Sequence, residues 1–303
     1  MILDHIAYYF VDRGNLLEAM PEATWIFPLY YVFHIIGRLA FPIMVFLLVE
    51  GFIHTKNIKR YVLLILITAF VTEVIYDYGN AGKFDAAQQN PLFILFVGLV
   101  LLCGIEAMYK VDKWDGVFKS VKYVIYYTAG AIVTYLFFWE GRSVFYILSG
   151  FAGKTATDYL VFLSSGLFKA IILGSGFVSL AFFIYLFKKR TEEEKCRFAY
   201  SMALVISAML LVSRFILKID YGAFGLLAIV MAYSFRKDPR TRMLAAVLPL
   251  FLTNPYEVVS FVLVFIVAGY NGERGNIRSK YFYYVFFPLH IAVIYSLSKL
   301  LCG

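Results

Sequence analysis

A long apolar stretch near the start of the chain carries polar side chains that a lipid bilayer rarely tolerates. Residues 25–55 are long enough to cross a bilayer, which takes roughly 20 apolar residues, yet the stretch contains His34, Arg38 and Glu50. A charge at membrane depth costs about 3 kcal/mol on insertion scales. We therefore predict that this stretch lines a polar site inside a helix bundle.

Pro42 interrupts the same stretch. Proline has no N–H, so the carbonyl of Arg38, four residues earlier, loses its helical partner. In lipid that carbonyl must find another donor or face a water-filled cavity. One span thus holds a cation, an unpaired carbonyl and, one turn before Arg38, the imidazole of His34.

The composition indicates a multi-pass membrane protein. The 303 residues are 62% hydrophobic, with a mean hydropathy of +0.77, whereas soluble domains are about 45–50% apolar. We find no cleavable secretory signal, internal repeat or linker, and expect a single membrane domain over residues 1–303. The net charge of +8 does not indicate nucleic-acid binding, because the basic residues fall in alternating loops. Three scattered cysteines give neither a metal-ligand spacing nor a disulfide framework: Cys103, Cys196 and Cys302.

Eleven apolar runs predict an all-α bundle of about 10–11 transmembrane helices. The runs lack the period-two alternation of barrel strands. The first run rises only about 16 Å against a hydrocarbon core of about 30 Å, so we expect either a half-helix or a chain that starts upstream of Met1. Residues 143–158 are expected to form an interfacial helix or a re-entrant segment. The runs cover approximately residues 1–11, 25–54, 60–78, 91–109, 120–139, 160–187, 196–213, 219–235, 241–253, 256–270 and 281–301.

Lysine and arginine are unevenly divided between the two sets of loops. Nineteen lie in the loops after the second, fourth, sixth, eighth and tenth runs, whereas six lie in the other loops. Cytoplasmic loops carry the excess of basic residues. We therefore expect the amino terminus to be cytoplasmic and, with eleven crossings, the carboxyl terminus to lie outside.

The first and last runs carry candidate catalytic histidines. Asp4 and His5 are adjacent, and neighbours in a helix point about 100° apart, so each must find its partner on another span. In the last run Pro288 frees the carbonyl of Tyr284, and His290 follows about 15 Å into the span, close to the midplane. A histidine beside a kink at that depth indicates a functional site.

Other charged residues have both structural and functional interpretations. The guanidinium of Arg38 cannot be neutralised by proton loss, and its structural alternative is a buried ion pair with Glu50, Glu73, Asp4 or Asp220. Basic residues after Glu50 could be ordinary cytoplasmic loop charges or phosphate contacts for a cytosolic cofactor. At the start of the eighth run, Asp220 could complement the helix dipole or contribute to a site.

Six short motifs resemble the TraX family of integral-membrane proteins. That family is first named for the conjugative-pilin acetyltransferase and is similar to a wider group that includes the bacterial acyltransferase-three proteins and the lysosomal heparan glucosaminide N-acetyltransferase. The resemblance spans nearly the whole chain, although family members usually have about one more turn before Asp-His. The motifs are Asp4-His5, Gly37-Arg38-x-x-Phe41-Pro42, Glu50-Gly51-x-x-x-Thr55, Asp220-Tyr221-Gly222-x-x-Gly225, Asn271-Gly272-x-Arg274-Gly275 and Phe287-Pro288-Leu289-His290.

The resemblance implies an acyltransferase of the bacterial cytoplasmic membrane. It would move an acyl group, usually acetyl, from cytosolic acetyl-CoA to an amine or hydroxyl of a surface glycan or pilin-like peptide, with membrane lipid around it. Histidine suits the base, because its ordinary pKa of about 6.5 lies near working pH, and an arginine can stabilise the oxyanion.

Each candidate residue has an expected role. The catalytic set is His5, Arg38, His290 and Asp4. The coenzyme-binding set is Lys56, Lys59, Arg60, Arg274, Lys280 and Glu50. The acceptor-binding set is His34, Glu73, Asp220, Tyr221 and Tyr284. No residue is assigned to a metal.

Two alternative functions belong to other classes. Charges and broken helices inside a membrane also mark transporters and flippases. That interpretation expects inverted repeats, but the proline-and-histidine signals in the second and last runs do not pair in that way. A non-catalytic assembly protein is the third hypothesis, and it predicts no effect when the histidines are replaced.

Overall fold

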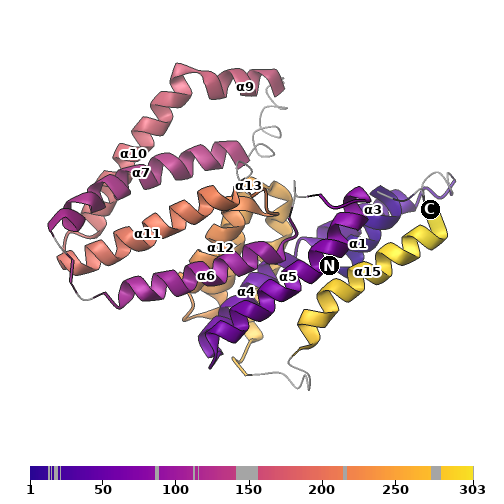
Figure 1. The fold of residues 1–303 in the computed structure, drawn as a ribbon. Coiled ribbons are helices and arrows are strands. Elements are labelled where there is room, and N and C mark those ends of the chain that lie inside the picture. Colours follow the sequence, from indigo (N-terminus) through magenta and orange to yellow (C-terminus); the bar gives the residue numbers. More distant parts are fainter. Residues whose placement is uncertain are drawn as a thin grey trace.

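A computed structural model describes most of the chain (Figure 1). The described residues are 1–12, 14, 16, 20, 22–85, 89–111, 113–114, 116–140, 156–213, 217–273 and 281–302, with only the backbone of residues 117, 156, 157 and 302. Within these ranges the regular structure is helical and no strand forms. The predicted all-α membrane bundle is confirmed. The segment expected to be interfacial or re-entrant lies almost entirely outside the described residues.

The helices follow one another with short connections. A π-helical turn, Tyr8–Asp12, follows the first helix, and 3₁₀ turns at Pro255–Phe261 and Val267–Gly269 flank α14. The α-helices are α1 (Ile2–Ala7), α3 (Ile26–Gly37), α4 (Ala40–His54), α5 (Ile58–Ala81), α6 (Leu92–Tyr109), α7 (Gly116–Glu140), α9 (Ala156–Ser164), α10 (Gly166–Leu186), α11 (Glu192–Val212), α12 (Gly222–Ser234), α13 (Pro239–Thr253), α14 (Val262–Ile266) and α15 (Phe282–Cys302).

Six helical segments of the described chain are long and apolar enough to cross a membrane. They are α3 together with α4, then α6, α7, α10, α11 and α15. The sequence prediction counted more crossings because it gave one to every apolar run. Two of those runs form shorter apolar helices, Gly222–Ser234 and Pro255–Gly269. The first run forms the six-residue α1 and the π-helical turn that follows it.

Helix α12 lies at the centre of the bundle and packs against α4, α6, α11 and α13. Its sequence is apolar on every side, which is typical of a helix surrounded by others. Leu226, Ala228 and Ile229 are fully buried. Gly98 of α6 lets α12 approach closely, since a Cβ there would lie 2.5 Å from Ile229 Cδ1. At the outer edge, α9 and α10 lie on the far side of α7 from α12 (Figure 1).

The basic ends of the helices gather on one face of the molecule. Arg60 donates to the Tyr281 hydroxyl at the start of α15, and Arg242 of α13 donates to Glu50 near the end of α4. Arg197 Nε donates to the carbonyl of Val111 over 3.0 Å. We call this end of the molecule the basic face. It is defined by Lys56, Lys59, Arg60, Lys119, Lys122, Lys188, Lys195, Arg197, Arg236 and Arg242.

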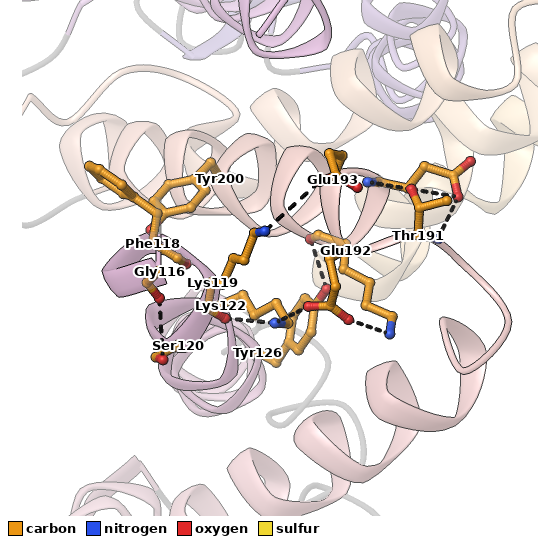
Figure 2. A network of polar contacts seen from close by, with 12 residues as sticks. Gly116, Phe118, Lys119, Ser120, Lys122, Tyr126, Thr191, Glu192, Glu193 and Tyr200 are labelled. Carbon is orange, nitrogen blue, oxygen red and sulfur yellow. Dashed lines mark hydrogen bonds and ion pairs between the residues drawn. The ribbon is translucent and has the colours of Figure 1, made fainter. Parts of the chain in front are cut away.

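An ion-pair network joins α7 to α11 on the basic face (Figure 2). Lys122 Nζ lies 2.7 Å from Glu192 Oε2, and Lys195 Nζ lies 2.7 Å from Glu192 Oε1. The Lys122 side chain is almost wholly buried. The Glu192 side chain is 43% exposed, and removing Glu192 would leave the buried Lys122 charge without its anion. The network therefore has a structural explanation, because it joins α7 to α11.

The predicted break near Pro42 is present. Helix α3 ends at Gly37, and α4 begins at Ala40, so Pro42 falls in the first turn of α4, where its missing N–H breaks no helical bond. The carbonyl of Arg38 accepts a hydrogen bond from Ser260 Oγ at 3.1 Å. The expectation that this carbonyl finds a donor outside its own helix is therefore confirmed.

Candidate functional site

A polar cavity of about 740 Å³ lies at the helix ends opposite the basic face. It is bounded by α1, by the break between α3 and α4, and by the ends of α5, α7 and α13. We call it the central cavity. Its lining carries four carboxylates and two full cations: Asp4, Glu140, Asp220, Glu257, Arg38 and Lys218.

The two ends of the chain meet beside this cavity. Helices α1 and α15 run side by side, and Ser298 Oγ donates to the Tyr9 carbonyl over 2.5 Å. Nearer the start of both helices, His5 Nδ1 lies 2.9 Å from His290 Nε2. His5 lines the cavity, whereas His290 is buried behind it. The sequence prediction brought these two histidines to one site, and the structure joins them directly.

The hydrogen-bond chain fixes which nitrogen of each ring carries the proton. His290 Nδ1 lies 2.8 Å from the carbonyl oxygen of Phe286. A carbonyl can only accept, so His290 Nδ1 carries hydrogen, and in the neutral ring its Nε2 is an acceptor. His5 Nδ1 must then donate to it. Neutral His5 therefore has a lone pair on Nε2, which makes no hydrogen bond to any residue that the structure describes.

Asp4 and His5 have different hydrogen-bond partners, as expected for adjacent helical residues whose side chains point in different directions. Asp4 Oδ1 lies 2.7 Å from His34 Nδ1, and Asp12 Oδ2 lies 3.4 Å from the other nitrogen of that ring. Gly37 makes room for this contact, because a Cβ there would lie 2.5 Å from Asp4 Cβ and Cγ. Asp4 therefore orients His34, and its hydrogen bond goes to that ring and not to His5.

Arg38 reaches the cavity from the break between α3 and α4. Its Nη1 lies 3.7 Å from Glu257 Oε1. The Glu257 side chain is 2% exposed, whereas that of Arg38 is 37% exposed. The anion is therefore buried behind the cation, and the guanidinium faces the open space. Ser260 Oγ, which faces the Arg38 carbonyl, also lies 3.1 Å from Glu257 Oε2, so its single hydroxyl hydrogen is shared between the two acceptors.

The comparisons with known proteins agree with the motifs. The family model described as "TraX protein" matches residues 1–174 and 157–298. The chain belongs to the TraX family. It is 31% identical over 110 residues to the probable fimbrial assembly protein FimC, serogroup H1, of Dichelobacter nodosus, covering 34% of this chain and 40% of that relative. No solved structure matches the chain.

The acceptor-binding set predicted for this TraX-family chain divides in two. His34, Asp220 and Tyr221 line the cavity, and Tyr221 stacks on Phe41 with ring centroids 3.7 Å apart. Glu73 lies outside its lining and accepts from the backbone N–H of Asn90 at 2.9 Å. Tyr284 also lies outside it and packs against the main hydrophobic core.

The described residues of the predicted coenzyme-binding set lie on the basic face, away from the cavity. Lys56, Lys59 and Arg60 are exposed around the turn from α4 to α5. Helix α4 separates them from Arg38 by 15 residues, about 22 Å. Glu50 binds Arg242 and lies 3.0 Å from His54 Nε2. Arg274 and Lys280 lie outside the described residues.

Sequence reasoning missed the residue that pairs with Arg38. The predicted partners were Glu50, Glu73, Asp4 and Asp220, but the contact is with Glu257. The signal was present, because Glu257 is the single charge in the apolar run 256–270 and follows the Asn254-Pro255 turn. Glu140 was also missed; its Oε2 accepts from the Ala223 N–H at 3.0 Å beside the cavity.

Proposed function

We propose that this TraX-family protein is a membrane acyltransferase that moves an acetyl group from acetyl-CoA to an amine or hydroxyl. The observation that carries the proposal is the arrangement of His5, whose Nδ1 is held by His290 and whose Nε2 lone pair is left for a substrate. Arg38 lines the same cavity as His5. A base and a cation beside one cavity are the two groups that acyl transfer requires.

His5 Nε2 takes the proton from the acceptor as its nitrogen or oxygen attacks the acyl carbonyl. The new bond joins that atom to the acyl carbon, and the bond from carbon to sulfur breaks. His5 then gives the same proton to the departing sulfur and returns to its neutral state. His290 accepts from Nδ1–H throughout, so it acts as a positioning residue. An acyl-histidine intermediate on Nε2 is equally compatible with this geometry.

Arg38 supplies hydrogen-bond donors to the oxygen that becomes negative when the carbonyl is attacked. Donors held in place before the reaction stabilise such an oxyanion without reorganisation. The buried Glu257 fixes the guanidinium from behind and leaves part of it facing the cavity. The thioester of the donor supplies the activated acyl group.

The charge distribution supports separate places for the coenzyme phosphates and for the acceptor. Lys56, Lys59 and Arg60 on the basic face would bind the phosphates, because they are exposed cations. The central cavity carries more carboxylates than full cations, which suits the acyl end and the acceptor better than phosphate. The D. nodosus relative is named as a probable fimbrial assembly protein, which supports a fimbrial subunit as one acceptor.

The test uses the full chain purified in detergent with radiolabelled acetyl-CoA. A peptide with a free amine and a hydroxyl serves as acceptor, in parallel with membranes from a strain that lacks the gene. We expect label to appear in an acceptor, and expect His5→Ala and Arg38→Ala to reduce its rate at least about 10²-fold. The apparent melting temperature of each variant shows whether it is folded.

A matched control and a contrary outcome make this test decisive. Arg190→Ala removes an arginine whose side chain is 61% exposed and does not line the central cavity. This substitution should leave the rate unchanged. Transfer by His5→Ala at the wild-type rate would reject the assignment. Movement of a polar solute into proteoliposomes, without acetyl transfer, would favour the transporter hypothesis instead.

A further inference from the structure

A second, smaller pocket adjoins the central cavity at His5. Its volume is about 110 Å³. Six of its lining residues also line the central cavity: Asp4, His5, Gly37, Tyr76, Asp220 and Tyr221. The other lining residues have apolar side chains: Met1, Ala40, Phe41, Met44, Pro91, Phe287 and Ile291. We call it the side pocket, and His5 lies at its boundary with the polar space.

The helix directions give the side pocket an entrance and a deep end. Ala40 and Met44 lie one turn apart on the same side of α4, which runs from the central cavity towards the basic face. Phe287 and Ile291 have the same spacing on α15, which runs in the opposite direction. Ala40 and Ile291 are therefore nearer the cavity, and Met44 and Phe287 form the deep end.

An acyl group has the same division into polar and apolar parts. Its carbonyl carbon must lie within reach of the attacking atom and His5, whereas its hydrocarbon chain gains from an apolar environment. An apolar protein cavity of about 150 Å³ accommodates benzene, with six carbons. A pocket of about 110 Å³ therefore has room for a chain of roughly two to four carbons.

We propose that the side pocket receives the hydrocarbon chain of the acyl group and limits its length. This inference rests on the proposed acyl transfer and adds to it the class of donor, a short-chain acyl-CoA. Met44 determines the depth of the pocket, and Ala40 determines the width of its entrance. The carbonyl stays in the central cavity beside Arg38, and the chain enters the side pocket past His5.

The experiment compares acetyl-, butyryl-, hexanoyl- and octanoyl-CoA on the full chain, with two readouts. One is the rate of acyl transfer, and the other is the shift in melting temperature when each donor binds. In the wild type we expect both to fall beyond butyryl. Met44→Ala should extend the range to hexanoyl, with a gain of about fourfold for each additional methylene that the pocket admits. Ala40→Leu should weaken butyryl more than acetyl.

Leu47→Ala is the matched control for these variants. Leu47 lies on the same helix as Met44, but it is 46% exposed on the outer surface and lines neither cavity, so its replacement should leave the chain-length profile unchanged. An unaltered profile in both Met44→Ala and Ala40→Leu, with acetyl transfer intact, would overturn the side-pocket proposal alone. Neither binding nor transfer of any donor by the wild type would overturn the proposed function as well.

Discussion

At the scale of the residue, the site depends on which atom of each histidine is left for a substrate. The Phe286 carbonyl sets the tautomer of His290, His290 in turn orients His5 over 2.9 Å, and the result is a lone pair on His5 Nε2, the proposed base. Asp4 serves His34 instead. Two adjacent polar residues of one helix turn thus have separate roles, because their side chains leave the helix in different directions.

The positioning role of His290 can be separated from a direct catalytic role. His290→Ala removes the acceptor for His5 Nδ1–H, so we expect the transfer rate to fall about 10²-fold or more. His290→Gln restores an acceptor oxygen near the position of Nε2 and should recover most of the rate. The measurement is kcat for acetyl transfer, with acetyl-CoA binding followed separately. Equal loss in the two variants would mean that His290 handles a proton itself.

At the scale of the element, the sequence predicted the break in the helical span at Pro42, but it did not predict which residues contact Arg38 there. Pro42 implied an exposed Arg38 carbonyl, and the helix indeed breaks beside it. The donor, Ser260, and the anion, Glu257, could not be predicted, because periodicity describes one helix at a time. Contacts between residues more than 200 positions apart depend on how the helices pack, which no local pattern specifies.

The contact between α1 and α3 depends on Gly37. Gly37→Ala places a methyl group 2.5 Å from Asp4, so we expect a loss of about 1–3 kcal/mol from overpacking and a displaced Asp4–His34 pair. Thermal unfolding in detergent measures the effect. Gly174→Ala in α10 is the control, since nothing lies within 4 Å of its added Cβ. Equal melting temperatures for the two variants would show that α1 does not pack against Gly37 in the purified protein.

At the scale of the whole molecule, the alternating loop charges correctly predicted which helix ends lie together. Arg60 meets Tyr281, and Lys122 meets Glu192, although each pair is distant in the sequence. The number of crossings was less predictable, because an apolar run of 13 to 15 residues such as α12 can be buried inside the bundle as readily as in lipid. The charges also imply a direction across the membrane.

The basic face is expected to be cytoplasmic, since cytoplasmic loops retain lysine and arginine. Lys188→Cys, after α10, marks this face, and Lys83→Cys, after α5, marks the cavity face; both positions are exposed. With Cys103, Cys196 and Cys302 replaced by alanine, a membrane-impermeant maleimide on intact cells should label position 83 at once. Position 188 should react only after permeabilisation. The opposite labelling pattern would mean that the protein has the inverse orientation in the membrane, with the central cavity open to the cytosol. An acceptor outside the cell could then not reach His5 through the aqueous phase.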